Sequence, residues 1–155
     1  MSDYRTFVVP YDFSPHSAAA LYTATDLARR LNAGIHLVHA IQTPIYAYGY
    51  GGASAPPPVI DMEKVQESAL GSLREVAAKI RDFPGTVDLH VVEGAGLADT
   101  LCQLAEKLDA DLIVMGTHGR TGLSHVFLGS VAERTLRRAP CPVLTVQAPE
   151  ENEGR

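Results

Sequence analysis

The stretch Asp111-Leu-Ile-Val-Met-Gly-Thr-His-Gly119, followed by Gly129-Ser130, decides the fold. Its apolar run, Leu112 to Met115, is too short for a helix and does not alternate with polar residues. This favours a strand buried on both faces of a parallel sheet. Gly116 and Gly119 can adopt positive φ and let backbone N–H groups approach a ligand. Gly129-Ser130 then opens a predicted helix, whose N-terminus offers free N–H donors and a partial positive charge. The stretch therefore predicts a phosphate cradle.

The same residues have an interpretation without a ligand. Glycines after a strand are common turn residues, and Ser130 with Glu133 has the S-x-x-E spacing of a capping box. The loop has no GxxxxGK(S/T) or GxGxxG pattern, so it is neither a P-loop nor a dinucleotide-binding turn. The two interpretations are compatible, because several N–H groups are free at a helix start.

Length and charge limit the class of protein. The 155 residues suit one domain, predicted over residues 1–148, with an acidic tail at 149–155 that we expect to be disordered. The net charge of −5 argues against nucleic acid or an anionic membrane as partner. No apolar run is long enough to span a bilayer, and the N-terminus lacks the apolar core of a signal peptide, so we expect a cytoplasmic protein. Cys102 and Cys141 have no C-x-x-C partner, and we expect reduced thiols.

Strands and helices alternate along the chain, which predicts the order βαβαβαβαβ. This order favours an α/β fold with a single doubly wound five-stranded parallel sheet and about four helices, as in Rossmann-like proteins. In such sheets ligands bind beyond the carboxyl ends of strands at the switch point. If the first and fourth strands flank that point, Asp12 and Gly116 face each other across one crevice. The predicted strands are Thr6–Pro10, Ile35–Ile41, Val87–Val91, Leu112–Met115 and Val143–Val146; the predicted helices begin near Ser14-Pro15, Asp61, Leu97 and Ser130.

Residues 42–59 interrupt this alternation. The segment is rich in Pro, Gly and Tyr, shows no periodicity, and is long for a loop in a compact domain. We interpret it as a flexible flap or partner-contact loop whose tyrosines could cover a base or pack on a second subunit. A tolerated surface insertion explains the segment equally well.

The spacing of the glycines resembles the nucleotide-binding branch of the universal stress protein family. The pattern is G-x2-G-x9-G-S/T, and it is joined by Pro10-Tyr-Asp-Phe-Ser14 after the first strand and Leu37-Val-His-Ala40 at the end of the second. The likeness extends from Val8 to Val146. It implies an adenine nucleotide alpha hydrolase-like fold with strand order 3-2-1-4-5. It also implies ATP with Mg²⁺ as the ligand, and a homodimer paired through the last strand, Val143 to Val146.

The resemblance also assigns roles to individual residues. The acidic residue at the place of Asp12 lies beside the nucleotide, and the residue at the place of Ala40, more often a valine, offers its backbone to adenine. We expect Asp12 to reach Mg²⁺ only through water, because phosphate oxygens and waters hold most of the ion's coordination sites. The nucleotide-binding residues implied are Pro10, Tyr11, Asp12, Ala40, Met115, Gly116, Thr117, His118, Gly119, Arg120, Thr121, Gly129, Ser130 and Val131.

Several of these residues have simpler alternatives. Asp12 could merely support the start of the following helix, and Arg120 could be a solvated loop residue instead of a phosphate contact. His118 could contact phosphate when protonated, although a lone loop histidine is more often exposed. The six histidines show no paired-ligand spacing, so we predict no zinc site.

Three interpretations of function follow. The first is a dimeric, ATP-binding stress or signalling module, with the last strand as the sheet edge that a partner copy covers. The second is a slow ATPase or adenylyl-transfer enzyme. Without a P-loop lysine or an evident base beyond Asp12 or His118, we predict slow or absent hydrolysis and no catalytic set. The third is a structural dimer that binds no ligand, against which the intact glycine pattern argues.

Overall fold

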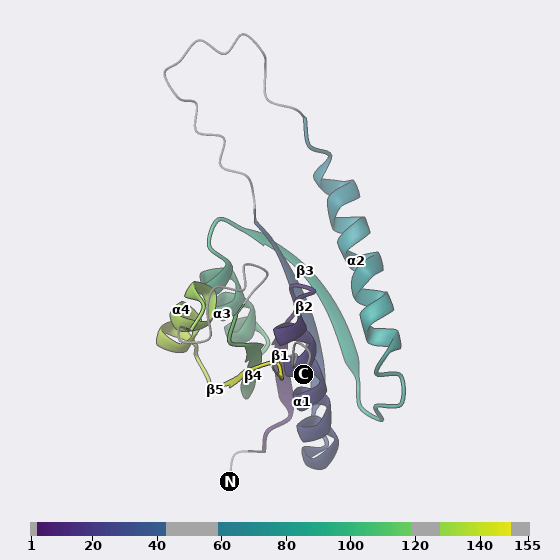
Figure 1. The fold of residues 1–155 in the computed structure, drawn as a ribbon, viewed down its shortest axis with the longest axis vertical. Coiled ribbons are helices and arrows are strands. Elements are labelled where there is room, and N and C mark those ends of the chain that lie inside the picture. The colour runs from purple at the N-terminus through teal and green to yellow at the C-terminus, as the bar shows by residue number, and fades with distance from the viewer. Residues whose placement is uncertain (1–2, 43–58, 119–127, 150–155) are drawn as a thin grey trace, which may run out of the picture.

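The computed structural model describes residues 3–42, 59–118 and 128–149 (Figure 1). Strands and helices alternate in the predicted order βαβαβαβαβ. The elements are β1 (Thr6–Pro10), α1 (Pro15–Leu31), β2 (Gly34–Gln42), α2 (Met62–Ala78), β3 (Val87–Gly94), α3 (Leu97–Lys107), β4 (Leu112–Gly116), α4 (Ser130–Arg138) and β5 (Val143–Val146).

The five strands form one parallel sheet in the order β3-β2-β1-β4-β5. The strand order that the resemblance implied is therefore confirmed. The chain first builds outward from β1 to β3, then returns to the other side of β1 with β4, where Val8 lies opposite Ile113. The switch point of the fold is thus between β1 and β4, and parallel sheets of this kind bind ligands at such a point.

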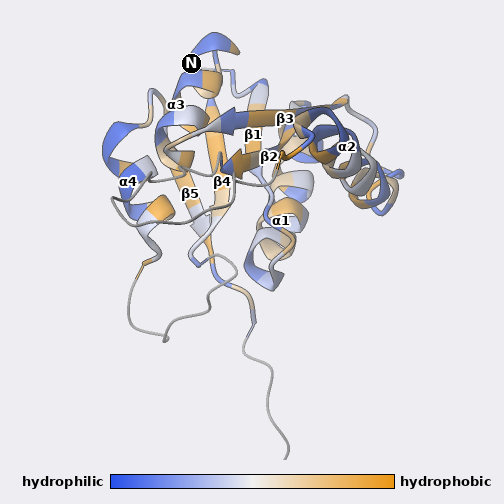
Figure 2. Cartoon of the chain, turned by 90° about the horizontal axis from the view of Figure 1, so that it is seen from above, coloured by the Kyte–Doolittle hydropathy of each residue, from blue (hydrophilic) through white to orange (hydrophobic). Residues whose placement is uncertain are grey.

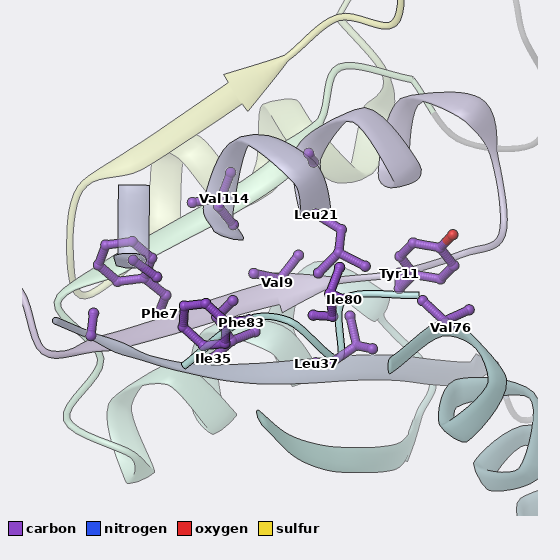
Figure 3. Close-up of a cluster of buried hydrophobic side chains, with 14 of the residues drawn as sticks. Phe7, Val9, Tyr11, Leu21, Ile35, Leu37, Val76, Ile80, Phe83 and Val114 are labelled. Atoms are coloured by element: carbon purple, nitrogen blue, oxygen red, sulfur yellow. The ribbon is translucent and has the colours of Figure 1, made fainter. Parts of the chain in front are cut away.

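Two apolar cores, one on each face, explain why β1 and β4 do not alternate apolar with polar residues. In β1, Phe7, Val8 and Val9 are all fully buried. Phe7 and Val9 pack beneath α1 and α2 (Figure 3), whereas Val8 packs toward α3 and α4. Viewed from above, α1 and α3 lie on opposite sides of the strands (Figure 2). No helix among residues 3–42, 59–118 and 128–149 is long and apolar enough to cross a membrane.

The predicted starts of α1 and α2 are confirmed, but the capping box at Ser130 is wrong. The Ser14 hydroxyl accepts a hydrogen bond from the Ser17 N–H at 3.2 Å, and Asp61 caps α2 in the same way. At α4 the cap position is occupied by Gly129, with no side-chain capping bond. Glu133 pairs instead with Arg137, 2.7 Å away. The first turn of α4 therefore keeps its N–H donors free of side-chain caps.

His36 and His90 form a pair across β2 and β3 that the sequence did not reveal. Their ring nitrogens, Nδ1 of His36 and Nε2 of His90, lie 2.9 Å apart, and both side chains are half-buried. Burial lowers the pKa of His90 from its ordinary value of 6.5, and the charge of a protonated His36 lowers it further. Within the described ranges no cluster of three or more His, Cys, Asp or Glu residues could hold a metal ion.

This pair predicts a loss of stability on the acid side. Because the folded-state pKa of His90 is lowered, the unfolded state binds the proton more readily. The stability contribution is therefore present above pH 6.5 and is lost as the pH falls through the lowered pKa. We expect the His90→Leu variant to lose less free energy of unfolding than the wild type between about pH 7.5 and about pH 5. Urea unfolding at each pH measures the difference, and equal losses in both proteins would contradict this prediction.

Candidate functional site

A cleft of about 850 Å³ opens at the carboxyl ends of the strands. This volume is within the range of about 300–1,000 Å³ that small-molecule sites occupy. The ends of β1, β2 and β4 form its floor, and α2, α3 and the start of α4 contribute walls. The cleft therefore lies at the switch point, where the fold brings together segments that are far apart in the sequence.

Most of the residues that the resemblance assigned to a nucleotide line this one cleft. Asp12 and Gly116 are both among them, because Asp12 follows β1 and Gly116 ends the adjacent strand β4. Gly119, Arg120 and Thr121 lie outside the described residues, as do residues 43–58 of the predicted loop and the tail from residue 150. The assigned residues found in the lining are Pro10, Tyr11, Asp12, Ala40, Met115, Gly116, Thr117, His118, Gly129, Ser130 and Val131.

Hydrogen bonds hold the loop after β1 in place. The Tyr11 N–H donates to the Val38 carbonyl at 2.7 Å, and the Tyr11 carbonyl lies 2.8 Å from Nδ1 of His39. Asp12 accepts from the Ser14 N–H at 3.0 Å, so its carboxylate does support the start of α1. Phe13 follows at φ 66° and packs its ring against Tyr11 and His39. Burial raises the pKa of Tyr11, with Tyr22 and Asp12 adding to the effect. Its hydroxyl is therefore neutral at physiological pH.

Gly116 is a glycine for a packing reason. A Cβ atom at this position would lie 2.8 Å from the backbone carbon and the Cβ of His16, in the first turn of α1. Real Cβ atoms do not approach so closely, and the backbone of a helix cannot easily move away. The close approach of β4 to α1 thus requires Gly116 whether or not a ligand is bound.

The loop that begins at Thr117 is closed at its base by backbone bonds. The Gly129 N–H donates to the Thr117 carbonyl at 2.7 Å, and the Thr117 N–H donates to the Val146 carbonyl at 2.9 Å. The end of β4, the start of α4 and the end of β5 are therefore fixed relative to one another. Gly129 itself has φ −61° and ψ 151°, which any residue adopts.

His118 is half-buried, which differs from the exposed loop histidine considered from the sequence. Its Nδ1 lies 3.0 Å from the Thr117 hydroxyl, and its ring centroid lies 5.1 Å from that of His16. The Nε2 atom is enclosed and has no hydrogen-bond partner in the described part of the chain. His16 in turn accepts from the Ala148 N–H at 3.0 Å. A buried ring nitrogen without a partner is costly, so this atom is a candidate donor or acceptor for a ligand.

The cleft also has lining residues that the glycine motif could not indicate. Among the described residues in its lining are one carboxylate, Asp12, one lysine, Lys64, and the histidines His39 and His118. Lys64 pairs with Asp61 at 3.3 Å. The one feature of the sequence that could have indicated these residues is the apolar stripe of α2, which looks like an ordinary core stripe. The additional lining residues include Ser17, His39, Lys64, Val65, Ser68, Ala69, Leu97 and Leu101.

Comparisons with known proteins agree with this geometry. The universal stress protein A homolog 1 of Coxiella burnetii is 35% identical over 145 residues, covering 92% of this chain and 96% of the relative. A universal stress protein of Methanocaldococcus jannaschii is 32% identical over 149 residues, covering 96% and 85%. Among solved structures, a universal stress protein in complex with cAMP aligns with a TM-score of 0.69 and 26% identity, over 96% of this chain and all of that one.

The family assignment rests on nearly the whole chain. The sequence model of the universal stress protein family matches residues 3–147. This range includes β1 to β5, α1 to α4 and the described residues that line the cleft. The chain belongs to the universal stress protein family.

Proposed function

We propose that this protein is an ATP-binding universal stress protein, a dimeric and nucleotide-responsive signalling module with slow or no hydrolysis. The main support is the convergence of Asp12, Gly116 and the uncapped start of α4 on one cleft at the switch point. A helix start without a side-chain cap presents N–H donors and the positive end of the helix dipole. That arrangement favours an anionic group, and a phosphate chain fits it.

The residues around the cradle suit a triphosphate. The N–H groups at the start of α4 would hold phosphate oxygens, and Nε2 of His118 would gain a partner that it lacks among the described residues. Mg²⁺ would be held mostly by phosphate oxygens and waters, with Asp12 as a water-mediated contact. Arg120, outside the described residues, remains the proposed cation of the loop. The relative in complex with cAMP supports an adenine nucleotide as the class of ligand.

Calorimetric titration with Mg-ATP tests this proposal, with AMP as the comparison. We expect micromolar ATP binding and much weaker AMP binding, because most of the contacts are assigned to the phosphates. The Gly129→Asp variant sharpens the test. Its carboxylate can cap α4 at the existing backbone angles and stabilise the helix by about 0.5 kcal/mol. The same carboxylate would occupy the N–H donors and repel phosphate, so ATP affinity should fall by at least about tenfold.

The control for Gly129→Asp is Gly71→Asp. Gly71 lies on α2, where a Cβ atom would meet no other atom within 4 Å, so this variant adds the same charge away from the cradle. We expect it to leave ATP affinity within about twofold of the wild type. Equal ATP affinity in Gly129→Asp and wild type would remove the α4 cradle from the proposal. An absence of nucleotide binding by the wild type up to millimolar concentration would overturn the proposal itself.

Hydrolysis should be slow. Phosphoryl transfer needs a positioned nucleophile and neutralisation of the developing charge. The described lining of the cleft contributes one carboxylate, Asp12, the histidines His39 and His118, and a Lys64 that is already paired with Asp61. We expect a turnover number for ATP below about 1 s⁻¹, the lower end of the usual enzyme range. A faster release of phosphate by the purified protein, measured with Mg-ATP in excess, would instead support the alternative of an ATPase.

Dimerisation is proposed through the edge strand β5. The carbonyl groups of Pro142 and Val146 accept hydrogen bonds from the N–H groups of Ile113, in β4, and Thr117, just after it. By alternation, the backbone groups of Thr145 point to the open edge. Thr145→Pro removes an outward N–H and leaves the bonds to β4 intact, whereas Thr145→Val keeps the N–H. We expect light scattering after size exclusion to show a monomer for Thr145→Pro and a dimer for Thr145→Val. A dimer in both variants would exclude β5 pairing, and a monomeric wild type would exclude the dimer.

A further inference from the structure

His36 and His90 place two metal-binding side chains together outside the cleft. Their ring nitrogens lie 2.9 Å apart, and the ring centroids are 5.1 Å apart with the ring planes tilted by 39°. Neither residue lines the cleft. The two positions are 54 residues apart in the sequence, and the parallel pairing of β2 with β3 brings them side by side. The spacing of the histidines in the sequence therefore could not reveal this pair.

The two histidines lie on the face of the sheet that α3 and α4 cover. Val38 and Val92, two residues further along β2 and β3, belong to the apolar core on this face. Side chains two positions apart on a strand point to the same face, so His36 and His90 point there as well. Both histidines are half-buried, because they lie at the border of that core. A half-buried position leaves part of the surroundings of a bound ion open to water.

The contact between the two rings has a nitrogen on each side. In a neutral imidazole one nitrogen is a donor and the other an acceptor, so one ring must carry its proton between His36 and His90. A divalent transition-metal ion can take the place of that proton and accept a lone pair from each ring. The ring that gives up the shared proton takes one on its other nitrogen, so both rings stay neutral. Neutral imidazole is the commonest metal ligand in proteins.

The spacing of the two rings fits a single ion. Metal–nitrogen bonds of about 2.0–2.1 Å place two nitrogens on one ion roughly 2.9 Å apart at a right angle and roughly 3.3 Å apart at the tetrahedral angle. The observed 2.9 Å is at the lower end of this range. The centroids of two imidazoles on one ion lie roughly 4.5–5.2 Å apart for the same angles. The centroid distance of 5.1 Å agrees with this range, so a rotation of the rings is enough to aim both lone pairs at a common point.

Two charged residues near the pair complete its surroundings. Asp88 lies opposite His36 in the register of β2 and β3, and two positions before His90 on the same face. The charges of Asp88 and Lys107 both act on His90. They have opposite signs and both side chains are exposed, so their effects on an ion largely cancel. Residues 3–42, 59–118 and 128–149 provide no group of three metal-binding side chains, so a bound ion keeps water in its other positions.

We propose that Nδ1 of His36 and Nε2 of His90 bind one divalent transition-metal ion, with water as the remaining ligands. The class of ion is the one that favours imidazole, namely Zn²⁺, Ni²⁺ or Cu²⁺. The ion joins β3, at the edge of the sheet, to its neighbour β2. This site does not depend on the proposed nucleotide binding, because it uses neither the cleft nor a phosphate group.

Calorimetric titration of Zn²⁺ into the full chain, without an affinity tag or nucleotide, tests the site. The variants are His36→Gln, His90→Gln and the double variant, because Gln keeps a polar group that can bond to the remaining imidazole. The matched control is His39→Gln, since His39 is also on β2 but faces the other side of the sheet. We expect the wild type and His39→Gln to bind one ion per chain, with affinities within about threefold. Each single variant should bind Zn²⁺ at least about tenfold more weakly, because even outer-shell partners contribute that much. The double variant should bind no more weakly than either single variant, because both histidines hold the same ion.

Several outcomes would overturn the site. Wild-type Zn²⁺ affinity in either single variant would do so, and losses that multiply in the double variant would indicate two separate ions. Absence of Zn²⁺ binding by the wild type up to millimolar concentration would also overturn it and leave the proposed nucleotide binding untouched.

Two further measurements do not rely on the affinities of the variants. Thermal unfolding in EDTA shows whether each variant folds, and added Zn²⁺ should raise the melting temperature of the wild type but not of His36→Gln or His90→Gln. The electron paramagnetic resonance spectrum of Cu²⁺ bound to the wild type should show coupling to two imidazole nitrogens. Coupling to one nitrogen or to none would contradict the proposed pair of ligands.

Discussion

The pairing of β1 with β4 is the contact on which the cleft depends. It joins segments more than a hundred residues apart, and the Asp111 carboxylate secures it by accepting hydrogen bonds from the N–H groups of Arg5 and Thr6 at 2.8 and 2.9 Å. With β1 and β4 side by side, the loops that follow them open at the same edge of the sheet. The cleft is therefore a consequence of strand order, and the individual side chains only refine its shape.

The glycines of the motif have different causes. Gly116 is explained by the close packing of β4 on His16, so its presence alone says little about a ligand. Gly129 has ordinary extended angles and occupies a cap position where Ser, Asp or Asn would stabilise the helix better. The lack of a side-chain cap at this helix start says more about a ligand, because the N–H groups left uncapped are the groups that bind an anion. Gly129 is therefore stronger evidence for an anion site than Gly116.

The sequence predicted the order of elements and the buried strands, because uninterrupted apolar runs such as Leu112 to Met115 have few other interpretations. Prediction from the sequence failed where the burial or pairing of a side chain depends on a residue far away in the chain. The half-buried state of His118 depends on His16, and the pairing of His36 with His90 depends on strand register. The residues of α2 that line the cleft were missed for the same reason, since a period of 3.6 shows which residues share a face and not what covers that face. The cap of α4 was misplaced by one residue, within the usual uncertainty of helix ends.

The long separation between β1 and β4 also has a kinetic consequence. The strands β1 to β3 pair with neighbours that are nearer in the sequence, whereas β4 must return to β1 across about two thirds of the chain. Contacts of such long range close late and slow folding. During synthesis the first three strands emerge well before β4 can join them. A ligand held between the ends of β1 and β4 would then stabilise the pairing of these two strands. Ligand binding would therefore mainly lengthen the time for which β4 stays paired with β1.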